Sequence, residues 1–215
     1  FISRWLKDLK VWKNHNNYSI ILNGADKNIF YKNLENRDEN PTKLKIVTHH
    51  WSDNVMKGYD IYKKLDSLLG DVKWKNKIEF TYIGNVNKNY NFKNTKIIKP
   101  LKGKNLANEL RKHNAYITAS INEPAGMHHI EGILSGLPII YRNSGALPEY
   151  CGDFGIVFQD QDFLPALKRM LKEYPTYKEN ITRYPHDSDK MNNEYLNLFL
   201  KLLQKRNEII KKRAL

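Results

Sequence analysis

The chain has 215 residues, and 36 Lys and Arg against 23 Asp and Glu give it a formal net charge of +13. Its hydrophobic content of 40% can bury a core, which excludes a wholly disordered chain. The single cysteine, Cys151, excludes a disulfide framework and a multi-cysteine zinc site. No apolar run approaches the length of a membrane span. Because the first residue is Phe1 and not Met, we expect the sequence to belong to a longer protein.

The positive charge is spread along the chain as Lys, beside many Asn and Tyr residues. This distribution favours a mainly solvated basic surface and leaves open a polyanion, an anionic lipid or a phosphorylated ligand. No helix-turn-helix pattern, RNP aromatics or zinc-finger spacing is present, so we do not expect a nucleic-acid partner.

The N-terminal part predicts a short helix over residues 3–13, capped by Ser3. A short apolar run at 18–22 ends in Asn23-Gly24, which is a turn signal. Residues 33–43 are polar and indicate a linker.

Strand and helix patterns alternate through the rest of the chain. We expect strands at 44–48, 78–83, 96–99, 115–118, 138–141 and 155–158, and helices at 58–69, 103–113, 125–135, 162–173 and 188–212. This alternation predicts an α/β fold, a Rossmann-like doubly wound parallel sheet with helices on both faces. We expect a crossover segment and linker over 1–43, the Rossmann-like domain over 44–187, and a basic helix over 188–215 that packs on or beyond it.

Ligands of such sheets bind outside the carboxyl ends of the strands, which here are the loops at 49–57, 84–87, 120–127 and 142–149. Pro124 suits the first turn of the helix at 125–135, so this helix would point its N-terminus, which favours an anion, into the crevice. Glu123 and Glu131 frame the helix and could hold vicinal hydroxyls. The alternative is that Glu123 only complements the helix dipole and Glu131 is solvated.

The surrounding motifs carry a family resemblance. They are Glu123, seven residues and Glu131; Ser135-Gly-Leu-Pro138; Ser144-Gly-Ala-Leu-Pro-Glu149; Lys57-Gly58; Ile83-Gly84; Asn23-Gly-Ala-Asp26 before Phe30; and the stretch 97–101. Together, from about residue 1 to about 183, they resemble the C-terminal, donor-binding domain of retaining GT-B glycosyltransferases of family 4, the glycosyl transferases group 1 type.

The resemblance implies a role for each matching residue. Glu123 would be catalytic and contact the donor sugar, Glu131 would hold the ribose, and Lys57 would neutralise the diphosphate. The remaining donor-binding positions that it implies are the backbone of Ala125, Gly126 and Met127, together with Gly84 and Ile98. It implies no metal and no cofactor beyond the nucleotide-sugar substrate.

One departure from the family pattern concerns the diphosphate. The family carries Gly-Arg near the end of its first strand, whereas this chain has Thr48-His-His-Trp51. His50 is our first substitute for the arginine and Arg142 our second, and with His50 the grip would depend on pH.

Other residues favour structural roles. His128 and His129 are adjacent on a helix and point about 100° apart, so they cannot share a metal. We expect Cys151 to be buried, and Tyr59 and Tyr62 to pack. The apolar residues of the last helix are expected to pack, although its basic end leaves peripheral membrane contact open.

The expected function is therefore retaining transfer of a sugar from a nucleotide-diphosphate sugar to an unknown glycan, lipid or protein acceptor. We expect it in the cytoplasm or at the cytoplasmic membrane face, and inactive without an N-terminal acceptor domain. The alternatives are a non-catalytic module that binds a sugar nucleotide or glycan, and a basic α/β domain that binds nucleic acid. The last would show a steep salt dependence with DNA or RNA.

Overall fold

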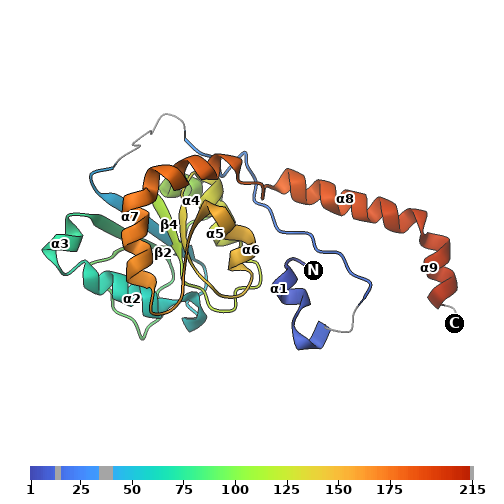
Figure 1. Cartoon of the computed structure of the whole chain (residues 1–215), viewed down its shortest axis with the longest axis horizontal. Coiled ribbons are helices and arrows are strands. Elements are labelled where there is room, and N and C mark those ends of the chain that lie inside the picture. The colour runs from blue at the N-terminus through green and yellow to red at the C-terminus, as the bar shows by residue number, and fades with distance from the viewer. Residues whose placement is uncertain (13–15, 34–40, 214–215) are drawn as a thin grey trace.

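Six parallel strands form the centre of the computed structural model, which describes residues 1–12, 16–33 and 41–213 (Figure 1). The strands are β1 (Leu44–His50), β2 (Ile78–Gly84), β3 (Lys96–Ile98), β4 (Ala115–Thr118), β5 (Ile139–Arg142) and β6 (Gly155–Phe158). Their order in the sheet is β3-β2-β1-β4-β5-β6. This is the order of a doubly wound Rossmann-like sheet, with its switch point between β1 and β4, and it confirms the predicted fold class.

Helices cover both faces of the sheet. They are α2 (Tyr59–Leu68), α3 (Val72–Lys75), α4 (Gly103–Leu110), α5 (Met127–Leu134), α6 (Leu147–Cys151) and α7 (Phe163–Asn180). Short 3-10 turns lie at η2 (Val55–Lys57), η3 (Gly152–Phe154) and η4 (Ile181–Arg183). Adjacent residues of β1 point to opposite faces of the sheet, and both are buried. Ile46 lies in the core under α2 and α7, and Val47 lies in the core under α4, α5 and α6.

The predicted packing residues lie in these two cores. Tyr59 and Tyr62 are fully buried residues of α2 that pack in the core under α2 and α7, and Cys151 is fully buried in the core under α4, α5 and α6. Burial raises the pKa of the Cys151 thiol well above its usual value, which keeps it protonated and unreactive.

The helix expected at 125–135 begins later than predicted, at Met127, so Pro124 is not in its first turn. Two hydrogen bonds hold the preceding loop in another path: Ala146 N–H donates to the Glu123 carbonyl at 2.8 Å, and Asn122 N–H to Ser144 Oγ at 2.8 Å. This loop places Glu123 outside the helix.

Other boundaries also differ. β1 runs to His50, two residues beyond the prediction, because pairing with β2 continues to Gly84. The sequence did not predict α3 or α6, and α7 continues through Pro175 to Asn180 because Tyr174 and Tyr177 are buried against the sheet.

The N-terminal segment packs against the core under α4, α5 and α6. Ser3 caps α1 (Arg4–Lys7) as predicted, by accepting from Leu6 N–H at 3.1 Å, and the rest of the expected helix is the short turn η1 (Lys10–Trp12). Its predicted last residue, 13, lies outside the described residues, as do positions 34–40 of the expected linker. The predicted turn at Asn23-Gly24 is wrong: the chain makes no turn at these two residues, and a Cβ on Gly24 would lie 1.9 Å from the Asp187 carbonyl oxygen.

The C-terminal helix is broken at Lys205 into α8 (Ser188–Gln204) and α9 (Arg206–Arg213), which project away from the sheet (Figure 1). No described side chain of α8 is buried, and Phe199 and Leu203 are 55% and 65% exposed. The packing expected for its apolar residues is therefore absent from the part of the chain that the structure describes. None of the described helices combines the length and apolar character needed to cross a bilayer.

Candidate functional site

A cavity of about 390 Å³ lies at the carboxyl ends of β1 and β2, beside the start of α5. It is lined by His49, His50, Trp51, Ser52, Lys57, Ile83, Pro100, Leu101, Lys102, Gly103, Leu106, Gly126, Met127, His128 and Glu131. Five of the predicted site residues therefore share one cavity: His50, Lys57, Gly126, Met127 and Glu131. Glu123 adjoins it through Lys57.

Glu131 is paired with a residue that the sequence analysis overlooked. Its Oε2 lies 2.8 Å from His49 Nε2, and His49 Nδ1 lies 3.1 Å from the Tyr116 hydroxyl. That hydroxyl also accepts from His49 N–H at 3.0 Å. The sequence would have indicated this pair if the predicted first strand had been extended to His50. His49 is two residues after Val47, so both residues lie on the sheet face that α5 covers.

His50 faces the other side of the sheet. It is 3% exposed, and its Nε2 lies 2.8 Å from the Tyr62 hydroxyl and 3.2 Å from Thr48 Oγ1. Burial, reinforced by the charge of Lys57, lowers the pKa of His50 well below its usual value. His50 therefore lines the cavity as a neutral imidazole, and its predicted role at the diphosphate stays a prediction.

Arg142, the second substitute, is held elsewhere. It is 4% exposed and forms ion pairs with Asp60 and with Asp160, the latter at 3.2 Å between Nε and Oδ1. It does not line the cavity, whose Lys and Arg side chains among the described residues are Lys57 and Lys102.

Lys57 and Glu123 form an ion pair. Lys57 Nζ donates to Glu123 Oε2 at 3.0 Å, and the Glu123 residue is only 6% exposed. Gly126 makes room for this arrangement, because a Cβ there would lie 2.9 Å from Glu123 Cδ and 2.6 Å from His128 Nδ1. Glycine is thus required by the close approach of two side chains.

The N-terminus of α5 opens onto the same cavity. Its N-cap is Gly126, which has no side chain to cap the helix, and Gly126 and Met127 both line the cavity. The first N–H groups of a helix lack partners within the helix, and the helix dipole adds positive potential there. This end of the cavity can therefore bind an anion.

Three further predicted positions lie outside the cavity lining. Gly84 has φ +144, and a Cβ there would lie 1.9 Å from the His50 carbonyl oxygen, so it allows the ends of β1 and β2 to meet. The Ala125 carbonyl accepts from Asn23 Nδ2 at 3.0 Å, and Ile98 packs on the core. Their predicted contacts with a nucleotide stay predictions.

The two adjacent histidines of α5 point in different directions. His128 Nε2 lies 2.8 Å from Thr118 Oγ1, whereas the His129 ring packs edge-on against Tyr150, and the two imidazole planes are 87° apart. Among the described residues no three His, Cys, Asp or Glu side chains gather as metal ligands.

A Rossmann-like parallel sheet with a cavity at the carboxyl ends of its strands has the arrangement in which open α/β domains bind their ligands. The model of the family Glycosyl transferases group 1 matches residues 70–187, so the chain belongs to this glycosyltransferase family. No curated protein sequence matches the chain.

Solved structures show the same fold at low identity. The sucrose-phosphate synthase of Thermosynechococcus elongatus is 17% identical with a TM-score of 0.63, over 86% of this chain and 53% of that one. Anabaena HepE in complex with UDP-glucose is 12% identical with a TM-score of 0.63, over 86% and 57%. The pneumococcal O-GlcNAc transferase GtfA, in complex with UDP and GlcNAc, is 14% identical with a TM-score of 0.63, over 88% and 41%. The chain thus has the fold of one half of a GT-B glycosyltransferase and spans about half the length of these proteins.

Proposed function

We propose that the chain is the donor-binding half of a retaining glycosyltransferase, and that the cavity at the carboxyl edge holds the nucleoside diphosphate of a nucleotide sugar. The observation that carries the proposal is the convergence of Lys57, Glu131 and the N-terminus of α5 on one cavity. The complexes of HepE with UDP-glucose and of GtfA with UDP support this class of ligand.

In this proposal the diphosphate lies between Lys57 and the N–H groups that begin α5. Both supply positive charge where negative charge develops as the bond from the sugar to the diphosphate breaks. The proposed transfer accordingly uses the charge of this chain's own groups and no metal. Lys102, also at the cavity, is a further cation within reach of the phosphates.

The proposal assigns Glu131 to the ribose hydroxyls. A carboxylate can accept from two vicinal hydroxyls, and the bond from Glu131 to His49 fixes its orientation. His49 is thus a positioning residue for Glu131.

The proposal assigns Glu123 to the transferred sugar. The ion pair of Glu123 with Lys57 supports this assignment, because the proposed diphosphate lies at Lys57 and the anomeric carbon of the sugar is bonded to that diphosphate. The bond from this carbon to the diphosphate oxygen breaks, a bond to the acceptor oxygen forms on the same face, and the acceptor hydroxyl passes its proton to the leaving diphosphate oxygen. We propose that the acceptor binds a separate N-terminal domain and that the reaction takes place in the cytoplasm.

Titration calorimetry with UDP, GDP and ADP, and with their sugar conjugates, tests the proposal. We expect one nucleoside diphosphate to bind at one site per chain, and Lys57→Ala to weaken it. Lys104→Ala is the matched control, because Lys104 is an exposed residue of α4 outside the cavity. Absence of binding by every nucleotide, or equal losses in the two variants, would overturn the proposal. Binding without transfer by the protein supplied with its N-terminal domain would favour the non-catalytic module.

A further inference from the structure

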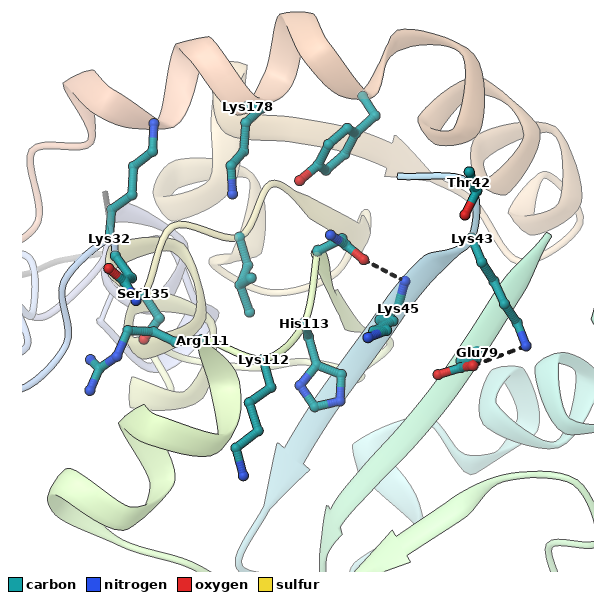
Figure 2. A pocket seen from close by; sticks show the side chains of 14 residues that line it. Lys32, Thr42, Lys43, Lys45, Glu79, Arg111, Lys112, His113, Ser135 and Lys178 are labelled. Atoms are coloured by element: carbon teal, nitrogen blue, oxygen red, sulfur yellow. Dashed lines mark hydrogen bonds and ion pairs between the residues drawn. The ribbon is translucent and has the colours of Figure 1, made fainter. Parts of the chain in front are cut away.

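A second cavity lies at the opposite edge of the sheet from the proposed donor site. Its volume is about 680 Å³, and Figure 2 shows it between the beginnings of the strands and α7. Lys43 and Lys45 come from the start of β1, Lys112 from the turn before β4, and Lys178 from α7. Because parallel strands all begin at this edge, the cavity is separate from the carboxyl-edge cavity.

The lining is strongly cationic. Its Lys and Arg side chains are Lys32, Lys43, Lys45, Arg111, Lys112 and Lys178. Among the described residues the only carboxylate of the lining is Glu79, which Lys43 already pairs at 3.0 Å. Glu109, just outside the lining, pairs with Lys112 at 2.6 Å. Among the described residues, the lining therefore carries more positive than negative side chains.

Lys178 is a half-buried cation of this lining. Figure 2 shows its side chain reaching from α7 into the hollow, while Lys112 points away from it. The Lys178 Nζ atom donates to the Gly136 carbonyl at 2.9 Å, and no carboxylate of the described residues pairs with it. Burial, together with the nearby charge of Lys32, lowers the pKa of Lys178 to about 8. A half-buried cation that no described carboxylate pairs with, near a second cation, is a candidate for binding an anion.

A neutral donor is available beside the cations. Ser135 lines the cavity, is 3% exposed, and has a hydroxyl that no described residue pairs with. Buried hydroxyls ordinarily have a hydrogen-bond partner, and an anion oxygen would supply one. The two observations, an unmatched set of cations and an unpaired buried hydroxyl, are independent and point to the same kind of ligand.

We propose that this cavity binds a small ligand carrying several phosphate groups, at a site separate from the donor site. Lys178, Lys45 and Lys32 hold its phosphate oxygens, and Ser135 donates a hydrogen bond. A recessed cavity of this volume suits a small soluble molecule, because nucleic acid or a membrane would contact the more exposed basic surface instead.

Titration calorimetry of the protein with tripolyphosphate, at an ionic strength of about 0.15 M, tests the site. In Lys57→Ala, which weakens phosphate binding at the proposed donor site, we expect one tripolyphosphate per chain, bound at this cavity. Lys178→Met and Lys45→Met should each weaken its binding about tenfold, because each removes one charge-assisted contact. Lys168→Met is the matched control: it makes the same change on α7 at an exposed residue outside the lining, and should change affinity less than about twofold.

Lys45 keeps the test decisive if Lys178→Met fails to fold, because Lys45 is exposed and its loss leaves no buried group unpaired. Equal losses in Lys168→Met, binding of many tripolyphosphates per chain, or loss of all binding in Lys57→Ala would overturn the proposal. So would binding to phosphatidylglycerol vesicles or to a DNA duplex that depends on Lys178 while tripolyphosphate does not bind. UDP affinity unchanged in Lys178→Met would support two separate sites.

Discussion

Lys57 Nζ lies 3.0 Å from Glu123 Oε2, and this bond joins the loop after β1 to the loop before α5. The two residues have separate roles in the proposed reaction, one at the diphosphate and one at the sugar. Because Glu123 is only 6% exposed, Lys57 also compensates the cost of burying its carboxylate. A substitution of either residue therefore affects both stability and binding, and the experiments must separate the two effects.

Lys57→Ala should weaken binding of a nucleoside diphosphate by about 1.5–3 kcal/mol and leave binding of the bare nucleoside nearly unchanged, because the lost contact is to phosphate. Calorimetry with both ligands measures the difference. The variant also leaves Glu123 unpaired, so its melting temperature should fall. Lys57→Ala combined with Glu123→Gln should recover part of that fall but none of the diphosphate affinity. Equal losses for nucleoside and diphosphate would remove Lys57 from the phosphate site.

The two carboxylates should separate by ligand. Glu131→Gln should weaken binding of both the nucleotide sugar and the bare diphosphate by about 1.5–3 kcal/mol, since the ribose is common to them. Glu123→Gln should spare the bare diphosphate. In the intact protein Glu123→Gln should lower kcat more than donor affinity, because contacts to the reacting sugar matter most in the transition state. The opposite pattern, with diphosphate binding sensitive to Glu123 alone, would show that the roles are assigned wrongly.

His49 should act through Glu131. His49→Leu removes the bond that orients the Glu131 carboxylate, so UDP affinity should fall, whereas His49→Gln retains a donor and should restore part of it. A double-mutant cycle with Glu131→Gln should give a coupling of about 0.5–3 kcal/mol, as for residues in direct contact. Additive losses would mean that His49 contacts the ligand independently of Glu131.

The sequence was sufficient to locate the strands, although not all of their ends, because most of them are short apolar runs that are buried in the sheet. The Ala115–Thr118 and Gly155–Phe158 strands lie at the predicted positions. The conformation of the loop before α5 could not be predicted from the sequence. Pro124 is compatible with a helix start, but the hydrogen bond from Ala146 N–H to the Glu123 carbonyl holds this loop outside the helix. That bond links residues 23 positions apart, and no local pattern reports it.

The candidate site shows the same division. Lys57 and Glu131 were found by motif and share the cavity. His49 was missed because the strand was ended two residues early, which hid its alternation with Val47. The charge state of His50 could not be inferred either, since it depends on burial beside Tyr62 and Lys57, which come from other parts of the chain.

Acid should destabilise the fold through His129. Its ring is fully buried, neither nitrogen has a partner among the described residues, and burial lowers its pKa from the usual 6.5 to about 3. His186, His49 and Lys57 add to this shift. Between pH 6.5 and about 3 the unfolded chain therefore binds a proton at this position that the folded chain does not. The stabilisation is complete above pH 6.5 and is lost as the pH falls, by at most about 1.4 kcal/mol per pH unit for this residue.

Urea unfolding of the wild type and of His129→Leu at pH 7, 6 and 5 measures this contribution. His129→Leu should flatten the fall in the free energy of unfolding by at most about 1.4 kcal/mol per pH unit, a limit approached between pH 6 and 5, because it removes one proton uptake. It should also be tolerated at pH 7, since an apolar side chain replaces a buried polar ring that no described residue pairs with. Ile133→Val, a buried change on the same helix, should lower stability by about 0.5–1.5 kcal/mol equally at each pH. If the free energy of unfolding of His129→Leu fell with pH as steeply as that of the wild type, the acid sensitivity would have to come from the other buried histidines, His50, His128 and His186.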